Sequence, residues 1–209
     1  MKRIAILASL VLIVAVPLLA QSPKGWKVRA DRSTSASDPD AAGAIKFVTA
    51  GSGFHATTPQ AAVFWNPANT ITGNYTLKGS FKLLKPSGHT NYYGLVFGGS
   101  DLEGANQNYL YFLVAQDGSW LVKRRNGEAT ENVVAKTPSD AVKKPDASGV
   151  STNALEVRVL ADKLEFAVNG TVVGSAPKTG PAAKTDGIYG IRSNHLLDIE
   201  VDGLSAAKR

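Results

Sequence analysis

An Asp-Gly pair between two β-rich runs restricts the fold of this chain more than any other feature of the sequence. The pair is Asp117-Gly118, and the two runs fill residues 109–125 on either side of it. An Asp-Gly pair in this position favours a two-residue type I′ hairpin, because both central residues of that turn have positive φ. The hairpin predicts that Ala115 pairs with Trp120, and this pairing decides which side chains share a face.

The two faces predicted for this ribbon differ in chemistry. One face is aliphatic and is the core candidate, with Leu110, Phe112, Val114 and Leu121. The other face places rings beside a guanidinium, a combination that can stack on a sugar and hydrogen-bond to it. The alternative is packing, because rings on strands contact other core residues more often than ligands. Together with the 99–108 loop at the rim, the predicted ligand-binding residues are Tyr109, Tyr111, Trp120, Arg124, Asp101 and Asn108.

The same alternation recurs along the chain. Residues 75–83 alternate apolar and polar side chains, and so do residues 196–204 at the end of the chain. Between them, residues 155–173 read as three strands joined by turns at Asp162-Lys163 and Asn169-Gly170, and all three predict the same buried side. After the first twenty residues no run of ten or more has good helical periodicity. The sequence therefore predicts an all-β fold of about a dozen strands, a two-sheet antiparallel jelly-roll sandwich.

The first twenty residues have the layout of a secretory signal peptide. Lys2 and Arg3 precede an apolar run over residues 4–16, and Ala20 is a small residue at the expected cleavage point. We expect cleavage after Ala20, a single domain over residues 21–209, and a secreted or periplasmic product. The apolar run is short for a membrane span, although an uncleaved anchor is the alternative. No other segment of the sequence has the pattern of a membrane span.

Composition restricts cofactors and partners. The chain has no cysteine, so no disulfide stabilises it. Without the two cations of the leader it has 21 Lys and Arg against 17 Asp and Glu, a mild net charge of +4, and its lysines are scattered, which argues against a nucleic-acid partner. The three histidines, His55, His89 and His195, are isolated in sequence, so we expect surface or loop positions and no zinc site. Residues 101–104 could contribute to a loop Ca²⁺ site but lack the dense Asp/Asn pattern of calcium loops. No cofactor is expected.

Several segments together resemble the concanavalin A-like lectin/glucanase superfamily. They are YYGLVFGG, NYLYFLVAQDGSWLVKRRNGE, ALEVRVLADKLEFAVNGTVVG, DGIYGIRS and LLDIEVDGLSA, within residues 75–205. Within the superfamily, the sequence is most similar to LamG-type and 3-keto-disaccharide-hydrolase-type domains. The resemblance implies two stacked antiparallel sheets, one of them concave, with sugars bound on the concave face or at its rim loops. Members include lectins, glycoside hydrolases and interaction modules, so the fold does not choose among these functions.

The sequence gives little support for catalysis. The Glu-x-Asp-x-x-Glu strand motif of the family 16 glucanases is absent. The nearest segment is Asp198-Ile-Glu200-Val-Asp202, whose carboxylates share one face of a strand at a Cα spacing of about 6.5 to 7 Å. It lies in the last strand with the wrong residue order, which favours a solvated face.

We therefore predict a secreted, lectin-like module that binds carbohydrate and is not catalytic. One alternative is a glycoside hydrolase of the 3-keto-disaccharide or family 16 glucanase-like type. The other is a structural or protein-interaction module.

Overall fold

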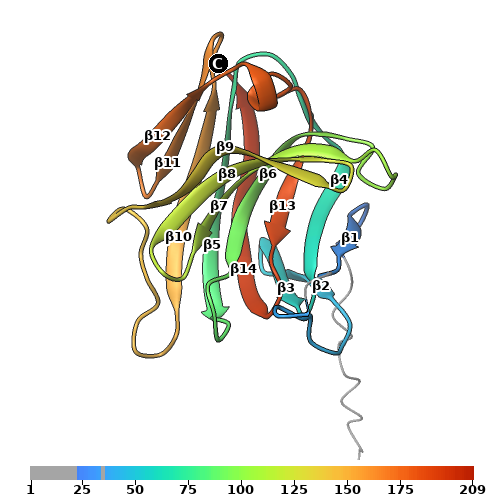
Figure 1. Ribbon diagram of the computed structural model, residues 1–209, viewed down its shortest axis with the longest axis vertical. Helices are drawn as coiled ribbons and strands as arrows, with labels where there is room; N and C mark the ends of the chain where they lie inside the picture. The colour runs from blue at the N-terminus through green and yellow to red at the C-terminus, as the bar shows by residue number, and fades with distance from the viewer. Residues whose placement is uncertain (1–22, 34–35) are drawn as a thin grey trace, which may run out of the picture.

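The computed structural model describes residues 23–33 and 36–209, which form fourteen strands and one short 3-10 helix (Figure 1). The predicted leader, residues 1–20, lies outside the described residues, so export and cleavage stay predictions. Within the described part of the chain, no helix has the length and apolar character needed to cross a bilayer.

Two seven-stranded sheets account for the architecture, and every strand pairing is antiparallel. Sheet 1 has the order β1 (Lys27–Asp31), β4 (Ala61–Ile71), β13 (Gly187–Ser193), β6 (Tyr92–Ser100), β7 (Asn108–Ala115), β8 (Ser119–Asn126) and β9 (Ala129–Pro138). Sheet 2 has the order β12 (Thr171–Pro177), β11 (Lys163–Val168), β10 (Ser151–Val159), β5 (Tyr75–Lys85), β14 (Leu197–Lys208), β3 (Gly53–Thr58) and β2 (Lys46–Ala50). The helix η1 (Gly180–Ala182) lies between β12 and β13. The predicted all-β, two-sheet sandwich is confirmed.

The core lies between the sheets and follows the alternation of the sequence. On β5 the side chains of Tyr75, Leu77, Phe81 and Leu83 are fully buried, while those between them are partly or fully exposed. Strand β14 repeats the pattern. Because successive strand residues point to opposite faces, an alternating sequence buries one side of the sheet and solvates the other.

The β10–β11–β12 segment agrees with its predicted faces. Arg158 pairs directly with Glu165 on the outer side, and the aliphatic side chains of both strands point into the core. Asn169 and Gly170 have φ of 52° and 84°, as a type I′ turn requires, and Val168 pairs with Thr171 across it.

The loop of the hairpin between β7 and β8 is one residue longer than predicted. Gly118 has a positive φ of 87° but Asp117 does not, and the Gly118 amide donates to the carbonyl of Ala115. These features are typical of a three-residue loop, a type I turn followed by a left-handed glycine. Trp120 consequently pairs with Val114 rather than Ala115. A shift of one residue reverses the faces of the whole of β8.

The predicted placement of Trp120 and Arg124 on the ligand face is therefore wrong. Trp120 is only 2% exposed, and its ring lies 5.8 Å from that of Phe112 and 6.0 Å from that of Phe166 in the core. Arg124 also turns to the core side, where it donates to the carbonyl of Pro181 in η1. Leu121 changes face in the other direction: it is predicted for the core face but lies on the outer face of sheet 1.

Candidate functional site

A second apolar cluster covers the outer face of sheet 1. Outer faces of antiparallel sheets are commonly solvated, yet these side chains pack together, and Leu102 of the β6–β7 loop packs among them. Its buried members are Val63, Trp65, Val96, Leu102, Tyr109, Tyr111, Leu113 and Leu121. The predicted residues Tyr109 and Tyr111 thus lie on the outer face, as expected, but Tyr109 is almost wholly covered and Tyr111 nearly so.

A buried ion pair stands at the centre of this face. The guanidinium of Arg192 on β13 donates through Nη1 to the carboxylate of Asp31 at the end of β1, and also to the hydroxyl of Tyr109 at 2.8 Å. The side chains are only 11% and 6% exposed. The guanidinium carbon also lies 5.3 Å from the ring centroid of Tyr111, a cation–π contact. Arg192 is therefore fixed in position by charge, hydrogen bonding and stacking.

The guanidinium keeps unused hydrogen-bonding capacity. Its Nε is buried and has no hydrogen-bond partner among the residues that the structure describes, at a cost in free energy. The side chain as a whole is 11% exposed, so its exposed part can contact a ligand.

The same surroundings set the ionisation of the neighbouring groups. Burial opposes the charge on Asp31, but Arg192, with smaller contributions from Arg125 and the Tyr109 hydroxyl, leaves its pKa below the ordinary value. Burial raises the pKa of Tyr109 and of Tyr111, so both phenols stay protonated at neutral pH. Asp31 is therefore a permanent carboxylate and the phenols are neutral donors.

Two small cavities open beside this ion pair and share Arg192 and Asn194. One, of about 170 Å³, lies along β7 and β8 and is lined by Tyr92, Tyr111, Leu113, Leu121, Lys123, Arg192 and Asn194. The other, of about 140 Å³, lies toward the loop after β1 and is lined by Asp31, Ser33, Asp38, Asp40, Ala61, Asn91, Arg192, Asn194 and His195. Together the two cavities form one short depression around Arg192. Tyrosine rings, the fixed guanidinium and carboxylates surround it.

The predicted rim residues Asp101 and Asn108 have structural contacts. Asp101 adopts a left-handed φ of 49° and its carboxylate accepts from the amide of Asn106 at 3.2 Å, which shapes the β6–β7 loop. Asn108 donates to Asn126 at 3.2 Å across the base of the β7–β8 hairpin. Neither residue lines the two cavities described above, so a ligand role for them stays a prediction.

Two of the three histidines, His89 and His195, lie in loops as expected, but they meet at one end of sheet 1 although they are far apart in sequence. Nε2 of His89, just before β6, lies 3.1 Å from Nε2 of His195, just after β13. His195 is only 4% exposed, so it is not a surface residue. Asp38 joins them in a group that could hold a metal ion. His55 lies on sheet 2 instead, paired with Asp198.

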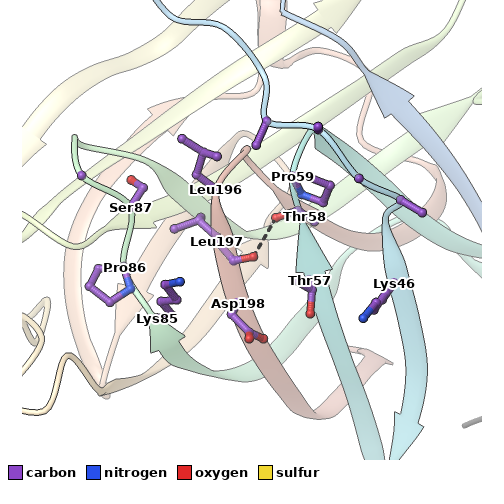
Figure 2. Close-up of a pocket in the computed structure, with 15 residues that line it drawn as sticks. Lys46, Thr57, Thr58, Pro59, Lys85, Pro86, Ser87, Leu196, Leu197 and Asp198 are labelled. Atoms are coloured by element: carbon purple, nitrogen blue, oxygen red, sulfur yellow. Dashed lines mark hydrogen bonds between the residues drawn. The ribbon is translucent and has the colours of Figure 1, made fainter.

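A larger cavity lies elsewhere, beside the ends of β3, β5 and β14 (Figure 2). It measures about 530 Å³, and its wall is mainly aliphatic with Lys46 and Lys85 at its edge. Two of its polar side chains are already paired: the Thr58 hydroxyl bonds to the carbonyls of Asn194 and Leu197, and Asp198 bonds to His55. No aromatic side chain lines it. With an aliphatic wall and no ring, it offers less for orienting a sugar than the Arg192 depression does.

The carboxylates of β14 are engaged in surface pairs. Glu200 lies 3.4 Å from Lys82, and Asp202 accepts from Ser52 at 3.1 Å, both on the outer face of sheet 2. These residues belong to the opposite sheet from the Arg192 depression. The predicted solvated face agrees with this position.

Sequence reasoning missed Arg192 and Asp31, which form the centre of the site. Alternation alone could have placed both side chains on an outer face, because each lies next to an apolar or small residue on a short strand. What the sequence does not show is that β1 and β13 lie on the two sides of β4, which brings the two charges together.

No protein-family model matches the sequence, and no curated protein matches it either. Solved structures do match. The carbohydrate-binding module CBM66 from Bacillus subtilis has a TM-score of 0.59 and 11% identity, over 88% of this chain and 96% of its own. A Bacillus subtilis protein of unknown function with a galectin-like fold has a TM-score of 0.58 and 15% identity, over 89% and 91%.

A third match is a family 16 glycoside hydrolase for mixed-linkage glucan from Bacteroides ovatus, solved with an oligosaccharide product. Its TM-score is 0.57 with 8% identity, over 90% of this chain and 97% of its own. At such identities the likeness concerns the fold and not the activity. The chain has the concanavalin A-like, two-sheet jelly-roll fold.

Proposed function

We propose that this chain binds carbohydrate in the depression around Arg192 and that it does so without catalysis. The observation that carries the proposal is the state of the guanidinium. It is held by Asp31, Tyr109 and Tyr111, it lines both cavities, and its side chain keeps 11% exposure there. A fixed cation at the wall of a cavity is suited to the hydroxyl or carboxylate oxygen of a sugar.

The rest of the depression fits the same kind of ligand. Tyr92 and Tyr111 line one cavity, and the partly exposed Tyr92 can offer a ring face, against which the C–H side of a pyranose packs. Lys123 and Asn194 add polar groups at the edge. Two matched structures are named as a carbohydrate-binding module and a glucan hydrolase, so this fold serves sugar ligands in other proteins. The predicted leader would bring the module to the periplasm or the cell exterior, where such glycans occur.

The non-catalytic part of the proposal is supported by the absence of the Glu-x-Asp-x-x-Glu motif from the sequence and by the ionisation of Asp31, the carboxylate paired with Arg192. A two-carboxylate glycosidase needs one carboxylic acid that stays protonated at working pH, which requires a raised pKa. The pKa of Asp31 is instead lowered. Turnover of aryl glycosides or 3-keto glycosides by the purified protein would contradict this part and favour the hydrolase alternative.

Arg192→Lys is the direct test of sugar binding. A glycan array identifies a ligand for the wild-type protein, and calorimetry then compares variants on that ligand. We expect Arg192→Lys to weaken binding at least tenfold, because lysine keeps the charge but loses the planar fork of donors. Tyr92→Ala should weaken it roughly 2- to 10-fold through lost stacking.

Arg158→Lys is the matched control, since Arg158 lies on the outer face of sheet 2 between Glu156 and Glu165. Circular dichroism and thermal unfolding of each variant separate lost binding from lost folding. Equal affinity of the wild-type protein and folded Arg192→Lys would contradict the site. The absence of any glycan ligand would favour the interaction-module alternative.

A further inference from the structure

Three side chains distant in sequence bring one ligand atom each to the same point. Oδ1 of Asp38 lies 2.9 Å from Nε2 of His89 and 3.1 Å from Nε2 of His195, and the two nitrogens are 3.1 Å apart. In a tetrahedral zinc site, with metal–ligand distances of about 2.0–2.1 Å, the ligand atoms are about 3.3 Å apart. The triangle therefore has the shape of a metal site and nearly its size.

Neighbouring groups hold both rings with Nε2 toward Asp38. Nδ1 of His195 lies 3.0 Å from a carboxylate oxygen of Asp40, and a proton on that nitrogen would leave a lone pair on Nε2. Nε2 of His89 lies 3.1 Å from the amide nitrogen of Asn91, a donor, which fits a lone pair on the histidine as well. In these tautomers both nitrogens and the carboxylate oxygen are available to a cation. A cation at the centre would accept a lone pair from each of the three atoms.

We propose that Asp38, His89 and His195 bind a divalent transition-metal ion, with Zn²⁺ as the best match. Two imidazoles and one carboxylate are a ligand set that Zn²⁺ accepts and that also suits Fe²⁺. Asp40 acts as a positioning residue, because a carboxylate on the second ring nitrogen of a metal-binding histidine fixes its tautomer and orientation.

The position of the site gives the ion access to the depression around Arg192. Asp38 and His195 line the 140 Å³ cavity together with Arg192 and Asn194. Three protein ligands leave at least one coordination position for water or another small ligand. The cavity is the space into which that position would open. The metal site stands whether or not the depression binds sugar.

Metal titration of the purified protein tests the proposal directly. After treatment with a chelator and removal of the chelator, calorimetry with Zn²⁺ should show one equivalent bound. Co²⁺ should give the visible d–d absorption of a four- or five-coordinate site, and added azide should change that spectrum if a coordination position is open.

Substitutions distinguish the proposed metal ligands from residues that do not bind the metal. His89→Ala and His195→Ala should lose the stoichiometric site, and Asp40→Asn should weaken Zn²⁺ binding about 10- to 100-fold. His55→Ala is the matched control and should bind like the wild-type protein. His89 is half-exposed, so its substitution should leave the fold intact even if that of buried His195 does not.

Failure of the wild-type protein to bind one equivalent of Zn²⁺ or Co²⁺ would overturn the proposal. So would equal binding by folded His89→Ala. A Co²⁺ spectrum that does not change when azide is added would contradict the open coordination position. Glycan binding is not a readout in any of these measurements, so a failed carbohydrate assay leaves their interpretation unchanged.

Discussion

Asp31→Asn should destabilise the protein by about 3 kcal/mol at neutral pH. Removing one partner of a buried ion pair costs about 3–5 kcal/mol, because the remaining charge stays buried without compensation. The side chains of Asp31 and Arg192 are 6% and 11% exposed, so solvent screens the pair little. The asparagine oxygen can still accept from Tyr109 and Arg192, which favours the low end of the range. Urea unfolding at pH 7 measures the difference.

The pH dependence of the stability difference between the wild-type protein and Asp31→Asn provides a second measurement. The pKa of Asp31 is lower in the folded protein than in the unfolded chain. Its contribution is therefore fully present above the unfolded value of about 4 and is lost as the pH falls through the lower folded value. We expect the stability gap between the wild-type protein and Asp31→Asn to narrow as the pH falls below about 4.

Asp198→Asn is the control for this substitution. Asp198 pairs with His55 on a partly exposed strand face, and such pairs contribute about 1 kcal/mol or less. A loss under 1 kcal/mol for Asp31→Asn, or a gap that stays constant from pH 7 to pH 3, would refute the reasoning.

Three further predictions concern the core and the turns, each measured by urea unfolding. Trp120→Ala should cost about 3–5 kcal/mol through the cavity left in the core, while glycan affinity per folded molecule stays unchanged. Gly174→Ala should cost about 1–3 kcal/mol, because its Cβ would lie 2.6 Å from the Trp120 ring, and the cost should fall in a Trp120→Phe background. Asn169→Ala should cost about 2–4 kcal/mol through lost side-chain hydrogen bonds and a left-handed φ, whereas Asn169→Asp should retain part of that stability. Equal stability of Asn169→Ala and the wild-type protein would contradict the role given to the turn.

The two turns of similar sequence show what alternation can and cannot predict. Asn169-Gly170 forms the predicted type I′ turn, and its flanking strands have the predicted faces. Asp117-Gly118 forms a longer loop, because the Asp117 side chain accepts from the amide and hydroxyl of Ser119 and Asp117 keeps a negative φ. This one-residue difference places Trp120 in the core and not on the outer face. The segments at residues 75–83, 109–125, 155–173 and 196–204 nevertheless form strands as predicted.

The histidine site could not be predicted from spacing. His89 and His195 are separated by 106 positions, and neither has a metal ligand within a few residues in sequence. They meet because β6 and β13 are antiparallel neighbours, so the start of one lies beside the end of the other. That adjacency is a property of the sheet order, which the alternation of single strands does not contain.

The depression combines residues from the first strand and from the second-to-last strand of the chain. Asp31 and Arg192 become neighbours only after β4 and β13 have paired in sheet 1. A molecule that occupies this depression therefore binds only the fully assembled sandwich, and by mass action it stabilises the whole chain against unfolding. Fragments that lack either end should be unable to hold it, so ligand affinity can serve as a quantitative assay for completed folding.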